Sequence, residues 1–357
     1  MNTKRLILIL LALLGAFALS ACSGAPAANS WHGLAADVER AYIAGGSFVY
    51  AVDLKTGNEI WRYPAVADSK LLFYANPVLT SDGQLLIGSA GANHPFISLD
   101  PATGKEKWVE PFAKGKSAWM ASPLVINKAI YAPNTDGSLY MINLDGKEAA
   151  APVDLGGTLW SPPATDGEFL YITSLDHRLN IINPVTGALQ KSIDLGGAAP
   201  SSPVIGNAGV YVGSFASTIE FIKPNGEHKV IAKAANWIWG SPVLDGKTLY
   251  YADLNGKVYS LDSVSGKENW NSAQKGAIVA SPLVVGDRIY VVTEAGDLVA
   301  MDQKGKLVWE KPVGGKVYTV PVATSDLILV APYQTDFALV AYKADGSQAW
   351  SPFVPVK

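Results

Sequence analysis

Histidine and cysteine are the residue types in this chain that could hold a metal or act as a nucleophile. The sequence contains one cysteine, so it can form neither an internal disulfide nor a zinc site built from cysteine pairs. The histidines show no i, i+4 pair that would place two ligands on one helix face. They are His32, His94, His177 and His228. We predict that they are surface-loop residues and that the protein binds no metal.

Other signatures of catalysis are missing from the sequence as well. The chain has no Gly-x-Ser-x-Gly nucleophile elbow and no Walker-type phosphate loop. Its acidic residues are spread over short turns, where Asp side chains commonly bond to the backbone. Examples are Asp136, Asp166, Asp245, Asp253, Asp287 and Asp297. We therefore predict no catalytic residue and no cofactor.

The single cysteine, Cys22, has a setting that predicts a covalent modification. Residues 1–22 combine a short basic segment with a Leu-rich run and end in small residues, which is typical of an export signal. The run is too short for a permanent transmembrane helix. Its end, LSAC at residues 19–22, resembles the bacterial lipobox, which implies that Cys22 becomes the lipidated N-terminus. An ordinary signal peptidase site beside an unmodified cysteine is the alternative.

These features divide the chain into three parts. We expect a lipoprotein signal peptide over residues 1–21, the lipidated Cys22 and a flexible linker over residues 22–30, and a folded body over residues 31–357. Two or more acyl chains hold a protein stably at a membrane. The predicted location is the cell envelope, outside the cytoplasm. Because Ser23 is not an aspartate, resemblance to Gram-negative lipoproteins implies the outer membrane where the cell has one.

The charge balance narrows the range of partners. The chain has 28 Lys and Arg against 31 Asp and Glu, a net charge of −3. Removal of residues 1–21 takes away Lys4 and Arg5 and no acid, which leaves −5. Because no basic excess is available to neutralise phosphates, nucleic acid is not a predicted partner. The apolar share of 49% excludes a disordered chain, and we expect a monomeric body.

An internal repeat of about forty residues runs from residue 31 to residue 350. A proline opens seven of the units, at intervals of 46, 40, 40, 39, 40 and 39 residues. These prolines are Pro77, Pro123, Pro163, Pro203, Pro242, Pro282 and Pro321. Projection back from Asp53 adds one more unit at the start, near Trp31, for eight in all. A period of this length is typical of solenoids and propellers.

Each unit reads as four short strands. In the sixth unit they are predicted at residues 242–244, 248–252 and 258–262 and around Trp270. The turn signals between them are Asp245-Gly246, Asn255-Gly256 and Ser265-Gly266, which favour tight hairpins. We predict an all-β fold, an eight-bladed β-propeller of four-stranded antiparallel blades. Either the segment after Cys22 pairs with the last blade, or the tail at 351–357 supplies its outer strand alone.

A motif of about eleven residues closes several units. It reads AVDLKTGNEIW at 51–61, SLDPATGKEKW at 98–108 and SLDSVSGKENW at 260–270, with shorter versions in the last two units. The third to fifth units end near Ala149, Gln190 and Val230 without the tryptophan. The motif resembles the tryptophan-docking motif of the PQQ-type β-propellers. The resemblance implies that each indole packs against the next blade. These structural residues are Trp61, Trp108, Trp270, Trp309 and Trp350.

The PQQ-type propellers divide into two functional groups. One is the quinoprotein dehydrogenases, which hold pyrroloquinoline quinone and calcium and typically carry a vicinal cysteine disulfide that Cys22 alone cannot form. The other contains non-enzymatic lipoproteins of the outer-membrane barrel assembly machinery. The resemblance therefore implies a binding scaffold, not an enzyme, with an envelope protein as its partner. A PQQ-dependent dehydrogenase and a small-ligand sensor or carrier are the alternatives.

Aromatic residues cluster just before several of the unit-opening prolines. We expect them to ring the mouth of the central channel as a candidate partner-binding face, since aromatic side chains are common at interfaces. The set is Tyr74, Trp119, Trp160, Trp237, Trp239 and Tyr318. Simple filling of a wide channel is the alternative. An acidic rim suited to a basic or polar partner is expected on the same face, from Asp136, Asp176, Asp253, Glu294 and Asp336.

Overall fold

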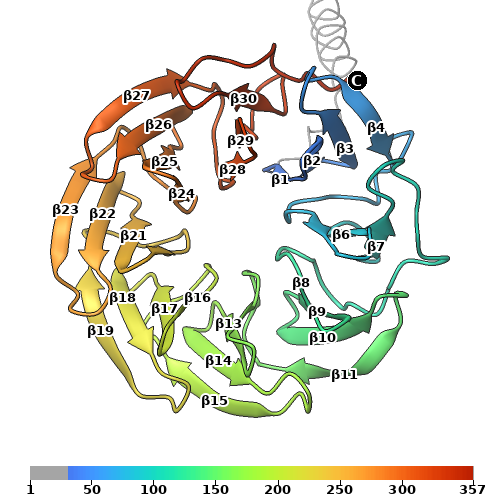
Figure 1. Cartoon of the computed structure of the whole chain (residues 1–357). Coiled ribbons are helices and arrows are strands. Elements are labelled where there is room, and N and C mark those ends of the chain that lie inside the picture. The colour runs from blue at the N-terminus through green and yellow to red at the C-terminus, as the bar shows by residue number, and fades with distance from the viewer. Residues whose placement is uncertain (1–30, 357) are drawn as a thin grey trace, which may run out of the picture.

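The protein is a ring of β-sheets. The computed structural model describes residues 31–356, and the predicted signal peptide, the lipidation site Cys22 and the linker up to residue 30 lie outside these residues. Eight antiparallel sheets follow one another around the ring (Figure 1). The prediction of an eight-bladed all-β propeller is confirmed. Between residues 31 and 356, no helix is both long and apolar enough to cross a membrane.

Each blade is made of consecutive strands, with the first strand nearest the centre and the last at the rim (Figure 1). Blade 1 contains β1 (Gly33–Ala36), β2 (Arg40–Gly45), β3 (Phe48–Asp53) and β4 (Glu59–Tyr63). Blade 2 contains β5 (Val78–Leu79), β6 (Leu85–Gly88) and β7 (Phe96–Leu99). Blade 3 contains β8 (Leu124–Ile126), β9 (Ala129–Pro133), β10 (Ser138–Asn143) and β11 (Glu148–Asp154). Blade 4 contains β12 (Ala164–Thr165), β13 (Leu170–Thr173), β14 (Arg178–Ile182) and β15 (Leu189–Asp194).

The second half of the ring repeats this order. Blade 5 contains β16 (Val204–Gly206), β17 (Gly209–Gly213), β18 (Thr218–Ile222) and β19 (His228–Lys233). Blade 6 contains β20 (Val243–Asp245), β21 (Thr248–Ala252), β22 (Lys257–Asp262) and β23 (Glu268–Ala273). Blade 7 contains β24 (Leu283–Val285), β25 (Arg288–Val292), β26 (Asp297–Asp302) and β27 (Leu307–Pro312). Blade 8 contains β28 (Val322–Ala323), β29 (Ile328–Val330) and β30 (Val340–Tyr342).

Blades 2 and 8 lack a regular outer strand. In blade 2 the outer segment pairs with β7 only through isolated bridges at Glu106 and Phe112. In blade 8 the corresponding bridges to β30 and the residue before it are made by Gln348 and Phe353. Six of the eight sheets therefore have the four strands expected, and two keep the fourth position with an irregular segment.

Hydrophobic residues gather between neighbouring blades. The middle strands are buried on both faces, as in β22, whose four central residues are all buried. The described residues form eight apolar clusters, and each draws on two adjacent blades. The core is thus a series of interfaces around the ring, which is why a blade is not expected to be stable alone.

The two ends of the described chain meet in one of these interfaces. Phe353 exchanges backbone hydrogen bonds with blade 8, receiving one from the Ala338 amide at 2.8 Å and donating one to the Leu339 carbonyl at 2.9 Å. Its ring contacts Tyr50 of blade 1, with 5.6 Å between centroids. Of the two closures considered from the sequence, the tail supplies the outer segment of blade 8.

Candidate binding mouth of the ring

One end of the central channel opens into a cavity of about 650 Å³. Six aromatic side chains line it: Trp31, Tyr74, Trp160, Trp239, Tyr318 and Tyr333. Loops that enter the first strands of blades line it together with loops between second and third strands, such as those at Leu254 and Glu294. Both kinds of loop therefore lie on one face, which we call the mouth face.

Register within the loops decides which side chains reach the mouth. The residue three positions before the unit-opening proline is partly exposed at Tyr74, Trp160, Trp239 and Tyr318. The residue four positions before it is at most 1% exposed in seven blades. These buried residues are Phe73, Trp119, Leu159, Ala199, Ile238, Ile278 and Val317. Alternating side chains in an extended segment explain the difference.

Trp119 is therefore not a residue of the mouth, which corrects the expectation from the sequence. Its side chain is fully buried between blades 2 and 3. The indole Nε1 donates to the carbonyl oxygen of His94 at 2.7 Å, and the ring meets Phe96 edge-on at 5.2 Å. A side chain in this position packs the blade interface and cannot contact a partner.

Trp31 lies in the mouth and joins three blades. Its ring centroid is 4.8 Å from that of Tyr74, 6.2 Å from that of Trp160 and 6.4 Å from that of Tyr318. These neighbours belong to the loops that enter blades 2, 4 and 8. From the sequence, Trp31 was expected near the aromatic residues of the mouth but was not included in the candidate set.

Trp237 and Trp239 form a second aromatic group beside the cavity. The Phe215 ring stacks on Trp237 with centroids 4.7 Å apart and an interplanar angle of 13°, and lies 5.1 Å from Trp239. The Trp237 side chain remains 48% exposed. The backbone of this residue is held in place because its carbonyl oxygen accepts a hydrogen bond from the Leu254 amide at 3.1 Å. A supported, exposed indole offers a large contact area with little conformational freedom to lose on binding.

The charge of Glu294 at the mouth is compensated. Lys316 donates to Glu294 Oε1 at 2.8 Å, and the Tyr318 hydroxyl donates to the same oxygen at 2.9 Å. These two hydrogen bonds hold the pKa of Glu294 below its ordinary value, so the carboxylate is ionised at neutral pH. The mouth therefore carries an ion pair and not a free negative charge.

The predicted acidic rim is only partly present. Asp253 is fully buried and accepts a hydrogen bond from the Tyr259 hydroxyl at 2.8 Å, so it is a structural residue of blade 6. Asp136 is partly buried and accepts from the Tyr140 hydroxyl at 2.7 Å. Of the five acidic residues predicted for the rim, Asp176 and Asp336 are exposed on loops between second and third strands.

The histidines do not form a site. Among residues 31–356, no three His, Cys, Asp or Glu side chains are grouped so that they could hold a metal. His177 is an exposed loop residue, as expected, whereas His228 is exposed but is the first residue of β19. His32 is not a surface-loop residue: its Nδ1 bonds to the Pro332 carbonyl oxygen at 2.6 Å, across the interface between blades 1 and 8. Burial lowers the pKa of His32, and the bond to this carbonyl opposes that shift.

Five tryptophans connect neighbouring blades at the rim. Each indole Nε1 donates to a backbone carbonyl oxygen in the following blade, and the last bond joins blade 8 to blade 1. The pairs are Trp61 with Pro101 (3.0 Å), Trp108 with Leu144 (2.9 Å), Trp270 with Gln303 (2.8 Å), Trp309 with Ala344 (2.9 Å) and Trp350 with Leu54 (3.1 Å).

The glycine of the motif makes room for the indole. Gly104 has φ +70°, and a Cβ atom added there would lie 2.5 Å from Cε3 of Trp61. No other residue could adopt this turn without both strain and a steric clash. At the interfaces that lack a tryptophan, other side chains approach the glycine, such as Lys191 of blade 4 at Gly226.

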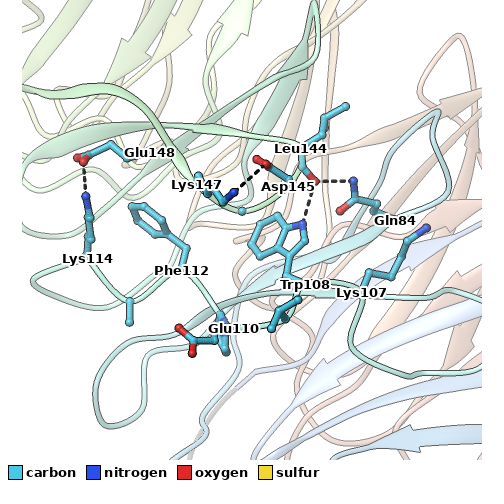
Figure 2. Close-up of a pocket in the computed structure, with 14 residues that line it drawn as sticks. Gln84, Lys107, Trp108, Glu110, Phe112, Lys114, Leu144, Asp145, Lys147 and Glu148 are labelled. Atoms are coloured by element: carbon cyan, nitrogen blue, oxygen red, sulfur yellow. Dashed lines mark hydrogen bonds and ion pairs between the residues drawn. The ribbon is translucent and has the colours of Figure 1, made fainter.

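A second cavity of about 870 Å³ lies near the outer edge, between the irregular segment of blade 2 and blade 3 (Figure 2). Leu144 is one of its lining residues, and its carbonyl oxygen accepts hydrogen bonds from Trp108 Nε1 and Gln84 Nε2, each at 2.9 Å. Two ion pairs lie around it, Lys114 with Glu148 and Lys147 with Asp145, and Lys107 donates to the Gly83 carbonyl oxygen at 2.9 Å. Although it is the larger cavity, its residues form no recognisable catalytic or ligand-binding set.

Together the eight blades, the docking tryptophans and the aromatic mouth define a PQQ-type β-propeller. A family model described as "Outer membrane protein assembly factor BamB" matches residues 45–149, 217–305 and 276–355. Since these matches cover more than half of the chain, the chain belongs to this family.

Individual relatives match over shorter stretches. The "Outer membrane protein assembly factor BamB" of Nitrosomonas eutropha is 32% identical over 111 residues, which are 31% of this chain and 27% of that protein. The "Quinoprotein alcohol dehydrogenase PedH" of Pseudomonas putida is 26% identical over 147 residues, 37% of this chain and 22% of that protein. The matched segments thus span less than a third of the length of either relative.

The fold is similar to that of a solved structure over most of its length. The crystal structure of BamB from Moraxella catarrhalis superposes with a TM-score of 0.66 and 16% identity, covering 88% of this chain and 91% of that one. At this level of identity the match establishes the shared propeller fold alone.

Proposed function

We propose that this chain is a lipid-anchored envelope protein that acts as a non-enzymatic scaffold in the assembly of outer-membrane proteins. In this proposal the acylated Cys22 holds the ring at the periplasmic face of the outer membrane, and the mouth binds an envelope protein. Membership of a family described as an outer-membrane protein assembly factor supports the role. The export signal and lipobox-like sequence support the location.

The convergence of aromatic side chains at the mouth carries the proposal. Rings from blades 2, 4, 6 and 8 meet there around Trp31 and its neighbours. The apolar faces of Trp and Tyr supply contact area and their polar tips supply hydrogen bonds, so they are common anchors of protein interfaces. Buried residues flank Tyr74, Trp160 and Tyr318 on both sides, which limits the freedom of these three loops to move.

The residues of the mouth do not fit the dehydrogenase alternative. Calcium prefers six to eight oxygen ligands, usually with several carboxylates. Glu294 is the one carboxylate that lines the cavity in the described part of the chain, and it is already bonded to Lys316 and Tyr318. Trp31 also occupies the space between the rings of facing blades. A quinone held by calcium would need a different set of donors.

One observation favours a small ligand as a second candidate. Ser201 lines the cavity, is 4% exposed, and its hydroxyl has no hydrogen-bond partner. Leaving a buried hydroxyl without a hydrogen bond costs free energy, and a ligand or a water molecule that bonds to it removes this cost. A ligand-dependent rise in melting temperature that is lost in Ser201→Ala would support this candidate.

Photo-crosslinking in intact cells tests the scaffold. Probes replace Trp239 and Tyr318 at the mouth, and matched probes replace Lys247 and Asp287 in the turns between first and second strands of blades 6 and 7. Adducts to a component of the outer-membrane assembly machinery from the mouth probes alone are the expected result. Equal adducts from both faces would contradict binding through the mouth. No adduct, combined with uptake of quinone and calcium by the purified protein, would favour the enzyme.

A further inference from the structure

The described chain begins inside the mouth. Trp31 is held by the rings of Tyr74, Trp160 and Tyr318. The next residue, His32, is fixed by its bond to the Pro332 carbonyl and by the hydroxyl of Thr319, which donates to the His32 carbonyl. Strand β1 follows at Gly33. Whatever precedes Trp31 therefore joins the ring at the mouth face.

The sequence bounds how far a lipid on Cys22 can lie from this point. Cys22 is nine residues before Trp31. A fully extended chain advances at most about 3.3 to 3.6 Å per residue, which limits the separation to roughly 32 Å. The anchor must reach the bilayer within this distance of the mouth.

The opposite face lies beyond that reach. To arrive there around the outside, the chain would cross a blade of four strands spaced about 4.8 Å apart, roughly 14 Å, and first the width of the channel. It would then descend the length of the strands, about 17 to 20 Å. The path exceeds the limit once the channel is included. A path through the channel would thread an acylated end past the rings that hold Trp31, and chains in proteins do not thread in this way.

The chemistry of the mouth face suits the surface of a bilayer. Trp237 is 48% exposed on this face, and indole and phenol side chains are enriched at the level of lipid headgroups. Lys316 compensates the carboxylate of Glu294, whereas Asp176 and Asp336 are exposed on the same face, so its aromatic side chains and not its charges favour the bilayer.

From this geometry we propose that the mouth face of the ring is turned toward the lipid bilayer, at a distance set by the nine-residue tether. This inference rests on the lipid anchor of the proposed function. It specifies that a partner of the mouth is met in the gap between the ring and the membrane. The opposite face, with the turns between first and second strands, points into the periplasm.

Energy transfer to the membrane tests the orientation. The acylated full-length protein is reconstituted in vesicles of phosphatidylethanolamine and phosphatidylglycerol that carry an acceptor dye on the headgroups. A donor dye is placed on a single introduced cysteine, which is the one free thiol because Cys22 is acylated. Mouth-face positions are Asp336→Cys and Ala295→Cys. Their controls in the same two blades are Asp326→Cys and Asp287→Cys.

We expect several-fold more transfer from each mouth-face position than from its control. Equal transfer, or more from the controls, would overturn the orientation. A long Gly/Ser insertion between Ser30 and Trp31 should keep the protein on the vesicles and equalise the four positions. Persistence of the difference in that variant would overturn the tether as its cause.

The two proposals fail separately. Cys22→Ser should abolish vesicle binding and transfer, and a wild-type protein that does not bind vesicles would overturn both the anchor and the orientation. Bound protein with equal transfer overturns the orientation alone and leaves the crosslinks to an assembly component unaffected. Missing crosslinks with unequal transfer contradict the scaffold and retain the orientation.

Discussion

At the scale of single residues, the docking tryptophans stabilise the ring through packing and one hydrogen bond each. Trp61 is 8% exposed, and its Nε1 bonds to the Pro101 carbonyl at 3.0 Å. We expect Trp61→Ala to lower the free energy of unfolding by about 3 to 5 kcal/mol. Trp61→Phe keeps most of the buried area and should cost clearly less. Urea denaturation followed by circular dichroism measures both.

The control for these variants is Val109→Ala, because Val109 is 99% exposed and belongs to the same kind of outer segment. Its effect should stay within about 0.5 kcal/mol. A loss below 1 kcal/mol for Trp61→Ala would mean that the indole contributes little to the interface between blades 1 and 2.

His32 predicts a pH dependence of stability. Burial lowers the pKa of His32 in the folded protein below its ordinary value of 6.5. The unfolded chain therefore binds more protons at acidic pH, and stability falls as the pH drops from about 6.5 through the folded pKa. Above 6.5 this contribution is fully present. His32→Gln should flatten the acid limb of a plot of unfolding free energy against pH, while His177→Asn, at an exposed position, should leave it unchanged. Equal slopes in all three proteins would contradict the assignment.

The sequence predicted the setting of residues that recur at one position of the repeat. It did not predict which aromatic side chains of the entering loops are buried, because a shift of one residue along the loop decides this. The five docking tryptophans recur at one position of the unit, so their shared setting could be foreseen. Trp119 and Trp160 differ by a single step relative to their prolines, yet the first is buried and the second reaches the mouth. The apolar residue four positions before each proline was the signal that separates them.

At the scale of elements, three neighbouring interfaces lack the tryptophan, and one of them can be filled. Lys191 of β15 pairs with Ile181 of β14, as Trp61 pairs with Ala51 in blade 1. Its stem lies 3.5 Å from where a Cβ on Gly226 would be. We expect Lys191→Trp to raise the unfolding free energy by roughly 1 to 2 kcal/mol, because an indole buries more apolar area there.

The matched control is Gln190→Trp, one residue earlier. Gln190 occupies the register shift between Ile181 and Ile182 and is exposed. It should give no gain in a denaturation experiment. A similar effect of both substitutions would show that the gain does not come from docking on Gly226.

Strand order was predictable and strand regularity was not. The hairpin signals of the sixth unit placed its strands within about two residues of β20 to β23, because Asp-Gly and Asn-Gly define both ends of a hairpin. In blade 8 the outer segment meets β30 and the residue before it only through bridges at Gln348 and Phe353. The motif around Trp350 is present in the sequence, but it does not predict whether the outer segment of blade 8 forms a regular strand.

At the scale of the whole molecule, closure of the ring depends on contacts between residues about 300 positions apart. A repeat pattern describes each unit and its neighbour, so it leaves open which end of the chain completes the circle. The structure places four kinds of contact at this interface: the Trp350 indole, the His32 ring, the Phe353 segment and the shared apolar cluster. Among residues 31–356, closure is therefore carried by side chains and the tail, and the two ends exchange no strand.

This arrangement predicts that loss of the tail contacts opens the ring at the interface between blades 8 and 1. Phe353 is 5% exposed and contacts both blades of the closing interface, whereas Val354 beside it is 56% exposed. Phe353→Ala should cost about 3 to 5 kcal/mol, and Val354→Ala should be nearly neutral. Because each blade touches only its neighbours, hydrogen exchange should rise in β1 to β3 and in β29 and β30 and stay unchanged in blades 4 and 5. A uniform rise around the ring would instead show that the blades open together and that the closing interface has no special role.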